Sequence, residues 1–127
     1  TRTKNKIMLE LFEDYTYDLT DYERDVLLPQ FVHGFQNRNG VTKAVTNKQI
    51  VERMKKNGYK LNDARVRKII AHVRVHDLVP GLMASSKGYY VSTDAEEIEK
   101  YIRSLAGRVA AITYVRRSMQ QYLLTLK

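Results

Sequence analysis

The sequence contains no cysteine, no tryptophan and only two prolines among its 127 residues. Without cysteine, disulfides, thiolate metal sites and a cysteine nucleophile are excluded, and the composition fits a cytoplasmic protein. No apolar run approaches the roughly 20 residues of a membrane span, so we expect no membrane association. The chain begins with Thr1 and lacks a signal-peptide-like apolar stretch, so we expect a processed, tagged or excised cytoplasmic chain.

Residues able to form a catalytic or metal site are also scarce. His72 and His76 are four residues apart on a predicted helix, a spacing that can hold a metal. However, Val73 follows His72 where the metalloprotease motif has glutamate, and a role facing solvent or phosphate is the simpler interpretation. The isolated Gly81 and Gly88 form no glycine-rich phosphate loop. We therefore expect no enzyme activity, no metal and no cofactor.

Negative charge is rare in the middle of the chain. The net charge is +8, and residues 41–92 carry 11 basic and 3 acidic side chains, which accounts for the whole excess. Such a segment favours binding to a polyanion, because each neutralised phosphate releases a counterion. A solvated basic surface with no ligand is the alternative that charge alone leaves open.

Hydrophobic spacing and capping residues predict the elements. A helix from Thr20 to Gln36 is expected, with a Thr20–Glu23 capping box and a kink, or a later start, at Pro29. The apolar stripe of this helix contains Leu27, Leu28, Phe31, Val32 and Phe35. A strand over 41–45, a helix over 46–56 and a helix over 62–76 follow. Strands over 78–84 and 89–91 then flank a turn at 85–88.

This order predicts a mostly α fold with a small β-hairpin: a winged helix-turn-helix followed by a long C-terminal helix. We expect an N-terminal arm over 1–18, the winged helix-turn-helix domain over 19–92 and the long helix over 93–127. The last helix is predicted to begin with a capping box of Thr93 and Glu96.

The helix over 62–76 is the predicted recognition helix in the major groove of double-stranded DNA. Its Val66, Ile69, Ile70 and Val73 share the buried face, while Lys68, Ala71, His72 and Val75 are expected opposite them. Arg65 and Lys68 have the length and donors to bond guanine. The predicted DNA-binding residues are Lys43, Thr46, Asn47, Lys48, Asn62, Arg65, Arg67, Lys68, His72, Ser86 and Lys87.

Three segments also resemble small winged helix-turn-helix DNA-binding proteins of phages and prophages. They are VTNKQI at 45–50, DARVRKII at 63–70, and LVPGL with SSKGYYV at 78–82 and 85–91. The similarity runs from residue 41 to about residue 115, and the first 40 residues lie outside it. It implies sequence-specific DNA binding in phage or prophage transcription control or replication.

The C-terminal helix carries a heptad pattern that predicts a homodimer. Nine positions follow a 4-3-4-3 spacing from Ile98 to Leu126, and eight are apolar, with Arg116 as the exception. The predicted dimerisation residues are Ile98, Ile102, Leu105, Val109, Ile112, Met119 and Leu123. The first of these could instead pack on the domain core, and the apolar residues Ile7–Phe12 of the arm could cover the stripe.

Two other functions remain open at this stage. Winged helices also serve as protein–protein interaction or assembly modules without DNA binding. Single-stranded DNA or RNA could stack on Tyr89 or Tyr90, although strand alternation would bury one of the two rings.

Overall fold

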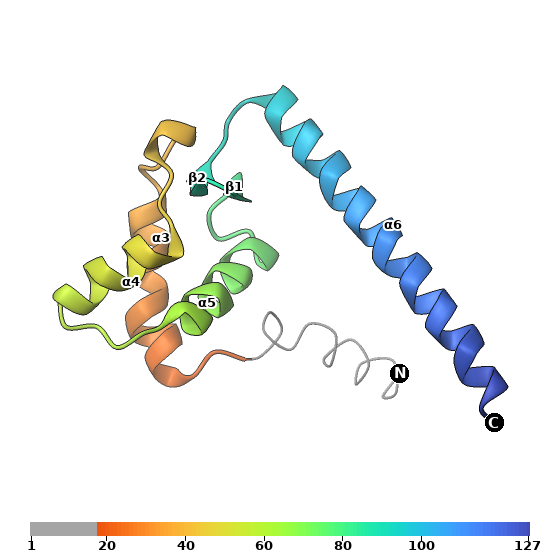
Figure 1. Ribbon diagram of the computed structural model, residues 1–127. Helices are drawn as coiled ribbons and strands as arrows, with labels where there is room; N and C mark the ends of the chain where they lie inside the picture. Colours follow the sequence, from red (N-terminus) through yellow and green to blue (C-terminus); the bar gives the residue numbers. More distant parts are fainter. Residues whose placement is uncertain (1–17) are drawn as a thin grey trace. The chain divides into compact units, whose positions relative to one another are not determined.

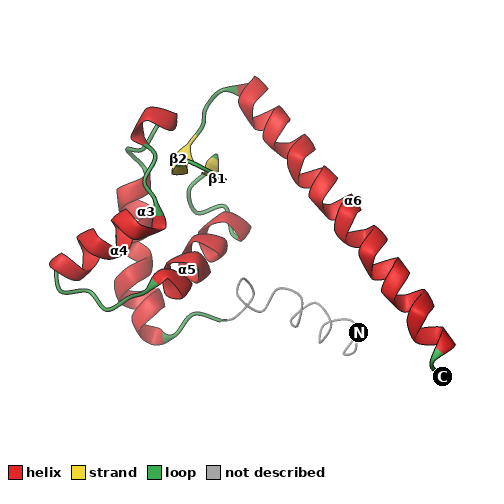
Figure 2. Ribbon diagram, viewed as in Figure 1, coloured by secondary structure: helices red, strands yellow, loops and turns green. Residues whose placement is uncertain are grey.

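A computed structural model describes residues 18–127, so the predicted N-terminal arm lies outside the described residues except for Asp18. The chain divides into two units between Ser92 and Thr93. The described part of the first unit packs helices and a two-stranded antiparallel hairpin together, and the second unit is one helix (Figures 1 and 2). The expectation of a mostly helical chain with a small hairpin and a long C-terminal helix is confirmed.

The first helical segment begins with the predicted capping box. The Glu23 amide donates to Thr20 Oγ1 at 3.2 Å, and the Thr20 amide donates to Glu23 Oε1 at 2.8 Å. A π-helical turn, η1 (Glu23–Leu27), leads into α3 (Leu28–Phe35). The irregularity expected at Pro29 therefore takes the form of a wide turn just before it, where proline's missing donor and bulky ring are accommodated.

The next two helices match the predicted positions and caps. Helix α4 (Asn47–Lys56) is capped by Thr46, and the Gln49 side chain completes a capping box. Helix α5 (Asp63–Val75) is capped by Asn62, whose Oδ1 accepts from the Arg65 amide at 2.9 Å. These caps satisfy backbone donors that a helix start otherwise leaves unpaired.

The predicted strand over 41–45 is wrong. Val41–Lys43 forms a 3-10 turn, η2, because local bonds from Lys43 to Gly40 and from Ala44 to Val41 satisfy its backbone. Only Val45 pairs, as an isolated antiparallel bridge to Tyr89. Its amide donates to the Tyr89 carbonyl at 3.0 Å, and the Tyr89 amide returns a bond of 2.8 Å.

The hairpin is shorter than predicted at its first strand. Strand β1 (Leu82–Ser85) pairs with β2 (Gly88–Val91), with Leu82 opposite Val91 and Ser85 opposite Gly88. Residues 78–81, expected in the strand, form a turn instead. Pro80 cannot donate to a strand ladder and Gly81 has a positive φ of 81°, so the chain turns there before pairing begins.

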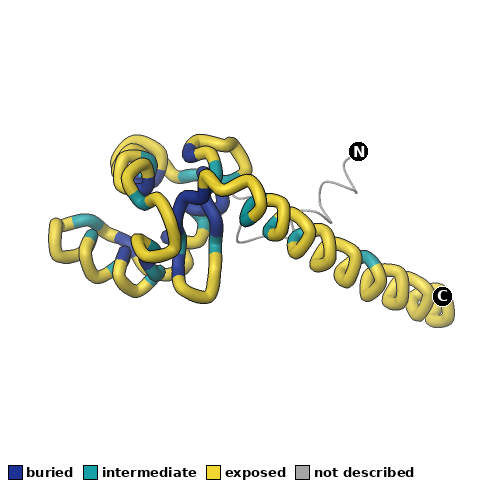
Figure 3. The backbone as a smooth tube through the Cα atoms, turned by 90° about the horizontal axis from the view of Figure 1, so that it is seen from above, coloured by how far each residue is buried: buried dark blue, intermediate teal, exposed yellow. Residues whose placement is uncertain are grey.

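The second unit is helix α6 (Ala95–Thr125), which has no buried residue (Figure 3). The predicted Thr93–Glu96 capping box is wrong, because Asp94 is the N-cap and accepts from the Glu96 amide at 3.0 Å. A carboxylate at the N-cap also suits the positive end of the helix dipole. Among the described residues, no helix combines the length and hydropathy needed to cross a membrane.

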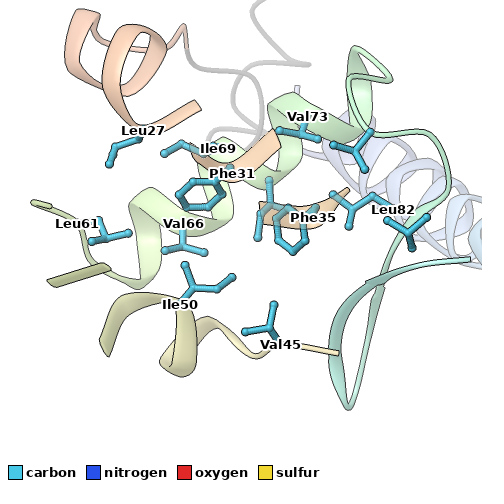
Figure 4. Packing of buried hydrophobic residues seen from close by; sticks show 13 residues of the cluster. Leu27, Phe31, Phe35, Val45, Ile50, Leu61, Val66, Ile69, Val73 and Leu82 are labelled. Atoms are coloured by element: carbon cyan, nitrogen blue, oxygen red, sulfur yellow. The ribbon is translucent and has the colours of Figure 1, made fainter. Parts of the chain in front are cut away.

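The hydrophobic core joins α3, α4, α5 and the hairpin (Figure 4). Leu27, Val66, Ile69 and Val73 are its most completely buried side chains. The predicted apolar stripes of α3, α4 and α5 face this core, which confirms the prediction. In α4 the buried residue of the stripe is Ile50. Packing of this kind contributes roughly 1.5–3 kcal/mol for each large apolar side chain, and it fixes how the basic surface residues are presented.

The backbone is crowded at Gly88, where the hairpin meets the segment before α4. Its φ is 117°, and an added Cβ would lie 2.5 Å from the Val45 carbonyl oxygen. We predict that Gly88→Ala lowers the free energy of unfolding by more than about 2 kcal/mol, because strain and a backbone clash add. Urea unfolding measures this loss.

Gly58→Ala is the matched control for this substitution. Gly58 also has a positive φ, of 89°, but a Cβ there meets nothing within 4 Å. Gly58→Ala should lower the free energy of unfolding only by the cost of the backbone strain, about 1–2 kcal/mol. Equal losses in the two variants would contradict the close contact at Gly88.

Candidate nucleic-acid interface

The side chain of Asn47 joins three elements of the first unit. Its Nδ2 donates to the carbonyl of Asp63, the first residue of α5, at 3.4 Å. Its Oδ1 accepts from the Tyr89 hydroxyl of β2 at 2.7 Å. The first turn of α4, the first turn of α5 and the hairpin therefore meet at one amide, and the residues beside them form one surface.

A second polar cluster lies where η1 meets α5. Glu23 is only 3 % exposed, and its carboxylate accepts from Arg65 Nε at 2.8 Å and from Lys68 Nζ at 2.7 Å. The Arg65 guanidinium also donates to the Lys60 carbonyl at 2.9 Å and lies 5.4 Å from the centre of the Tyr22 ring. Both side chains that were expected to bond guanine thus have intramolecular partners.

The pKa of Glu23 reflects these partners. Burial alone would raise the pKa, because it penalises the charged form. Hydrogen bonds from Lys68, from the Thr20 amide and from Arg65 outweigh burial and lower the pKa from 4.5 to about 2. Glu23 is therefore charged at every pH at which the protein is expected to function, and it holds both cations.

The remaining predicted DNA-binding residues fall into two groups. Thr46 and Asn62 are helix caps, so their side-chain oxygens are used locally. The exposed residues of the set are Lys43, Lys48, Arg67, Ser86 and Lys87, and they come from η2, α4, α5 and the hairpin turn. Of these, Lys48 adjoins Asn47, Arg67 lies one turn beyond Asp63, and Lys87 lies two residues from Tyr89.

His72, predicted as a DNA-binding residue, is partly buried and lies beside His76. Its ring centre lies 4.3 Å from that of His76. Burial lowers the pKa of His72, the neighbouring His76 lowers it further, and Asp18 opposes the effect. No group of three or more potential metal-ligating side chains occurs in the described part of the chain.

The face of α5 that was predicted to be exposed is partly buried near the middle of the helix. Ala71, expected opposite the core, is only 7 % exposed, whereas Val75 is 72 % exposed. Exposed Asp63, Ala64 and Arg67 mark the accessible first half of the helix. Accessible side chains on α5 are therefore concentrated near its N-terminus.

Both tyrosines of β2, Tyr89 and Tyr90, make packing contacts within the first unit. Tyr90 is 5 % exposed, which confirms that one ring of the pair is buried. Tyr89 packs edge-on against Phe35 with ring centres 6.3 Å apart, and its hydroxyl is bonded to Asn47. Tyr90 is therefore not available for base stacking, whereas Tyr89 is partly exposed.

Two features of this surface were missed in the sequence. Glu23 was expected as a capping-box partner, but its burial was missed, although it lies four residues before Leu27 in the series 23, 27, 31 and 35. That spacing places it on the buried stripe and would have predicted a paired carboxylate there. The Asn47–Tyr89 bond joins residues 42 apart in the chain, and no local pattern indicates it.

The predicted dimerisation residues lie along one face of α6. Ile102, Val109, Ile112, Met119 and Leu123 are between 49 and 64 % exposed. Ile98 and Leu105 are of intermediate exposure. Tyr122, Leu124 and Leu126 extend the exposed apolar surface toward the end of the helix.

We predict that the stability of the protein depends on the charge of Glu23. Because its folded pKa of about 2 lies below its ordinary 4.5, the contribution is complete above pH 4.5 and is lost as the pH falls toward 2. The difference corresponds to about 3 kcal/mol of unfolding free energy. Chemical unfolding of Glu23→Gln at pH 7 should show a loss of about 1–3 kcal/mol and a weaker decline below pH 4.5.

Asp21→Asn is the control, because Asp21 forms an exposed ion pair with Arg24 in the same helical segment. Its effect should stay within about 0.5 kcal/mol. A Glu23→Gln protein with the parent's stability and acid profile would contradict the buried cluster.

Comparisons with protein-family models, with curated protein sequences and with solved structures find no match to this chain. The resemblance to phage winged-helix proteins thus remains a prediction from the sequence motifs, and any functional argument depends on the site itself.

Proposed function

We propose that the first unit is a winged helix-turn-helix that binds double-stranded DNA through the first half of α5. The observation that carries the proposal is the Asn47 junction, which brings the starts of α4 and α5 to the hairpin. Exposed cations lie beside each of these elements in a segment of net charge +8. Three basic contact points on one rigid frame suit a duplex backbone and groove.

The connectivity of the unit supports the winged-helix part of the proposal. Helix α3 is followed by the bridging residue Val45, then by α4, α5 and the hairpin. Val45 pairs with β2 and not with β1, so the hairpin is attached to the segment before α4. In helix-turn-helix domains, the second helix of the pair enters the major groove with its N-terminal residues toward the bases.

Within the predicted set of DNA-binding residues, this proposal moves the base-reading role from Arg65 and Lys68 to Arg67. Arg67 is exposed and carries the bidentate donors that read guanine O6 and N7. In this proposal the exposed Lys48 and Lys87 neutralise phosphates of the duplex. Arg65 and Lys68 would have to leave Glu23 to reach a base, so in this proposal they orient α5.

A protein-interaction module is the second candidate function. The exposed Val75 at the end of α5 and the exposed stripe of α6 are apolar surfaces that another protein can cover. The two candidate functions predict different effects of salt concentration and of removing Arg67 on binding to a DNA duplex.

We predict that Arg67→Ala lowers affinity for a preferred duplex by roughly 1–3 kcal/mol and relaxes base preference. Lys48→Ala and Lys87→Ala should weaken binding evenly across sequences, each reducing the salt slope by about one phosphate contact, or about 0.9 log units. Fluorescence anisotropy with selected and random duplexes at several salt concentrations measures both effects.

Arg53→Ala is the matched control, since Arg53 is an exposed arginine that lines a cleft between α3 and α4 and adjoins none of the Asn47 partners. It should retain the parent's base preference. Duplex binding that Arg67→Ala leaves unchanged, or no duplex binding at low salt, would favour the protein-interaction function. Preference for single-stranded DNA or RNA in the same assay would contradict the major-groove assignment.

We also propose that α6 pairs with α6 of a second copy. The helix has 31 residues, or about 46 Å at 1.5 Å per residue, and none of its residues is buried. Identical chains offer matching heptad stripes, and burying each large apolar side chain yields roughly 1.5–3 kcal/mol. A two-fold dimer also suits a two-fold DNA site.

Ile112→Asp should convert the dimer into a monomer without unfolding it, because the Ile112 side chain is 53 % exposed in the single chain. Ser118→Asp introduces the same charge on the opposite face and should leave the dimer intact. Sedimentation velocity at micromolar concentration distinguishes these results. A monomeric parent chain would contradict self-association through α6.

A further inference from the structure

A cleft opens between α3 and α4 at the edge of the hydrophobic core. Its volume is ≈ 180 Å³. Phe31 and Phe35 of α3 and Ile50 and Met54 of α4 supply apolar walls, and Val45 contributes from the segment between them. Figure 4 shows Phe31 and Phe35 on one side, with Ile50 and Val45 facing them. None of the exposed cations of the proposed DNA surface lines this cleft.

Gly34 lies at the wall of the cleft and is not explained by packing. It is in the last turn of α3, it does not have a positive φ, and a Cβ added there would meet nothing within 4 Å. Glycine within a helix is less favourable than alanine, and here neither a turn nor a close neighbour requires it. Because Gly34 has no side chain, the space beside it in the cleft stays open.

The polar groups of the cleft indicate the charge of a ligand. Arg38 and Arg53 both line it, together with the amides of Gln30 and Asn57, and the lining described contains no carboxylate. Arg38 is held in place by a 3.1 Å bond from Nη1 to the Lys43 carbonyl. Two guanidinium groups beside apolar walls suit a carboxylate attached to a flat apolar body.

The volume limits the size of that body. A dry cavity of about 150 Å³ accommodates one benzene ring. The cleft is slightly larger than this and is walled by aromatic rings, whose edges favour another ring. It has room for one ring and a short acidic substituent.

We propose that this cleft binds a small single-ring aromatic carboxylate. The ring lies against Phe31, Phe35 and Met54, over Gly34, and the carboxylate faces Arg38 and Arg53. None of the cations of the proposed DNA surface lines the cleft, so the ligand proposal and the DNA proposal can be tested separately.

The proposal is tested by NMR titration of the full ¹⁵N-labelled chain with phenylacetate as the probe. Benzyl alcohol keeps the ring without the charge, and acetate keeps the charge without the ring. Phenylacetate should shift amide signals of α3 and α4 in a saturable way. Benzyl alcohol should bind at least about tenfold more weakly, and acetate should give no saturable shifts.

Variants distinguish the cleft from binding elsewhere. Gly34→Leu should abolish binding by filling the cleft, whereas Gly34→Ala should retain it and raise the melting temperature. Arg53→Gln should weaken binding at least about fivefold, and Lys56→Gln, on α4 but outside the cleft, should not. Circular dichroism verifies that each variant is folded.

Four results would overturn the proposal. The first two are no saturable shifts with phenylacetate and equal affinity for phenylacetate and benzyl alcohol. The other two are unchanged binding by folded Gly34→Leu and shifts confined to α5 or α6.

Discussion

The buried carboxylate of Glu23 is the interaction on which the first unit most depends. It completes the cap at Thr20, and it accepts from two cations of α5 that are three residues apart. A buried charge is tolerable only with such partners, so the start of the first helix and the direction of α5 are determined together. Removing any partner leaves the others less well compensated, because all share one carboxylate.

The sequence predicted most of the helical fold because helix signals are local. Thr46 and Asn62 cap the helices that they were expected to cap, and the stripes of Leu27, Ile50 and Val66 are buried. The errors occur where local bonds compete: a 3-10 turn replaces the strand at Val41, and Asp94 replaces Thr93 as the cap of α6. Choices between neighbouring acceptors or between turn and strand depend on small energy differences that spacing does not reveal.

The candidate site was less predictable than the fold, because it depends on contacts between distant residues. Charge distribution drew attention to residues 41–92, but charge does not show whether a cation already has a partner. Arg65 and Lys68 are paired with Glu23, 42 and 45 residues away, while Arg67 between them is exposed. Neighbouring cations on one helix thus have different roles. Arg65 and Lys68 are bound to Glu23, whereas Arg67 is exposed and available to a ligand.

The two hydrogen bonds of Asn47 have an entropic consequence. Ordinarily a hairpin tip and a helix start move independently, and a ligand that touches both must restrict that motion when it binds. Here the Tyr89 hydroxyl and the Asp63 carbonyl are tied to one side-chain amide during folding. For the proposed interface, part of the conformational cost of ordering the surface is therefore met before a ligand binds. Movement of the hairpin relative to the start of α5 would have to break the Asn47 contacts, so they favour ligands whose contact points match the spacing in the free protein.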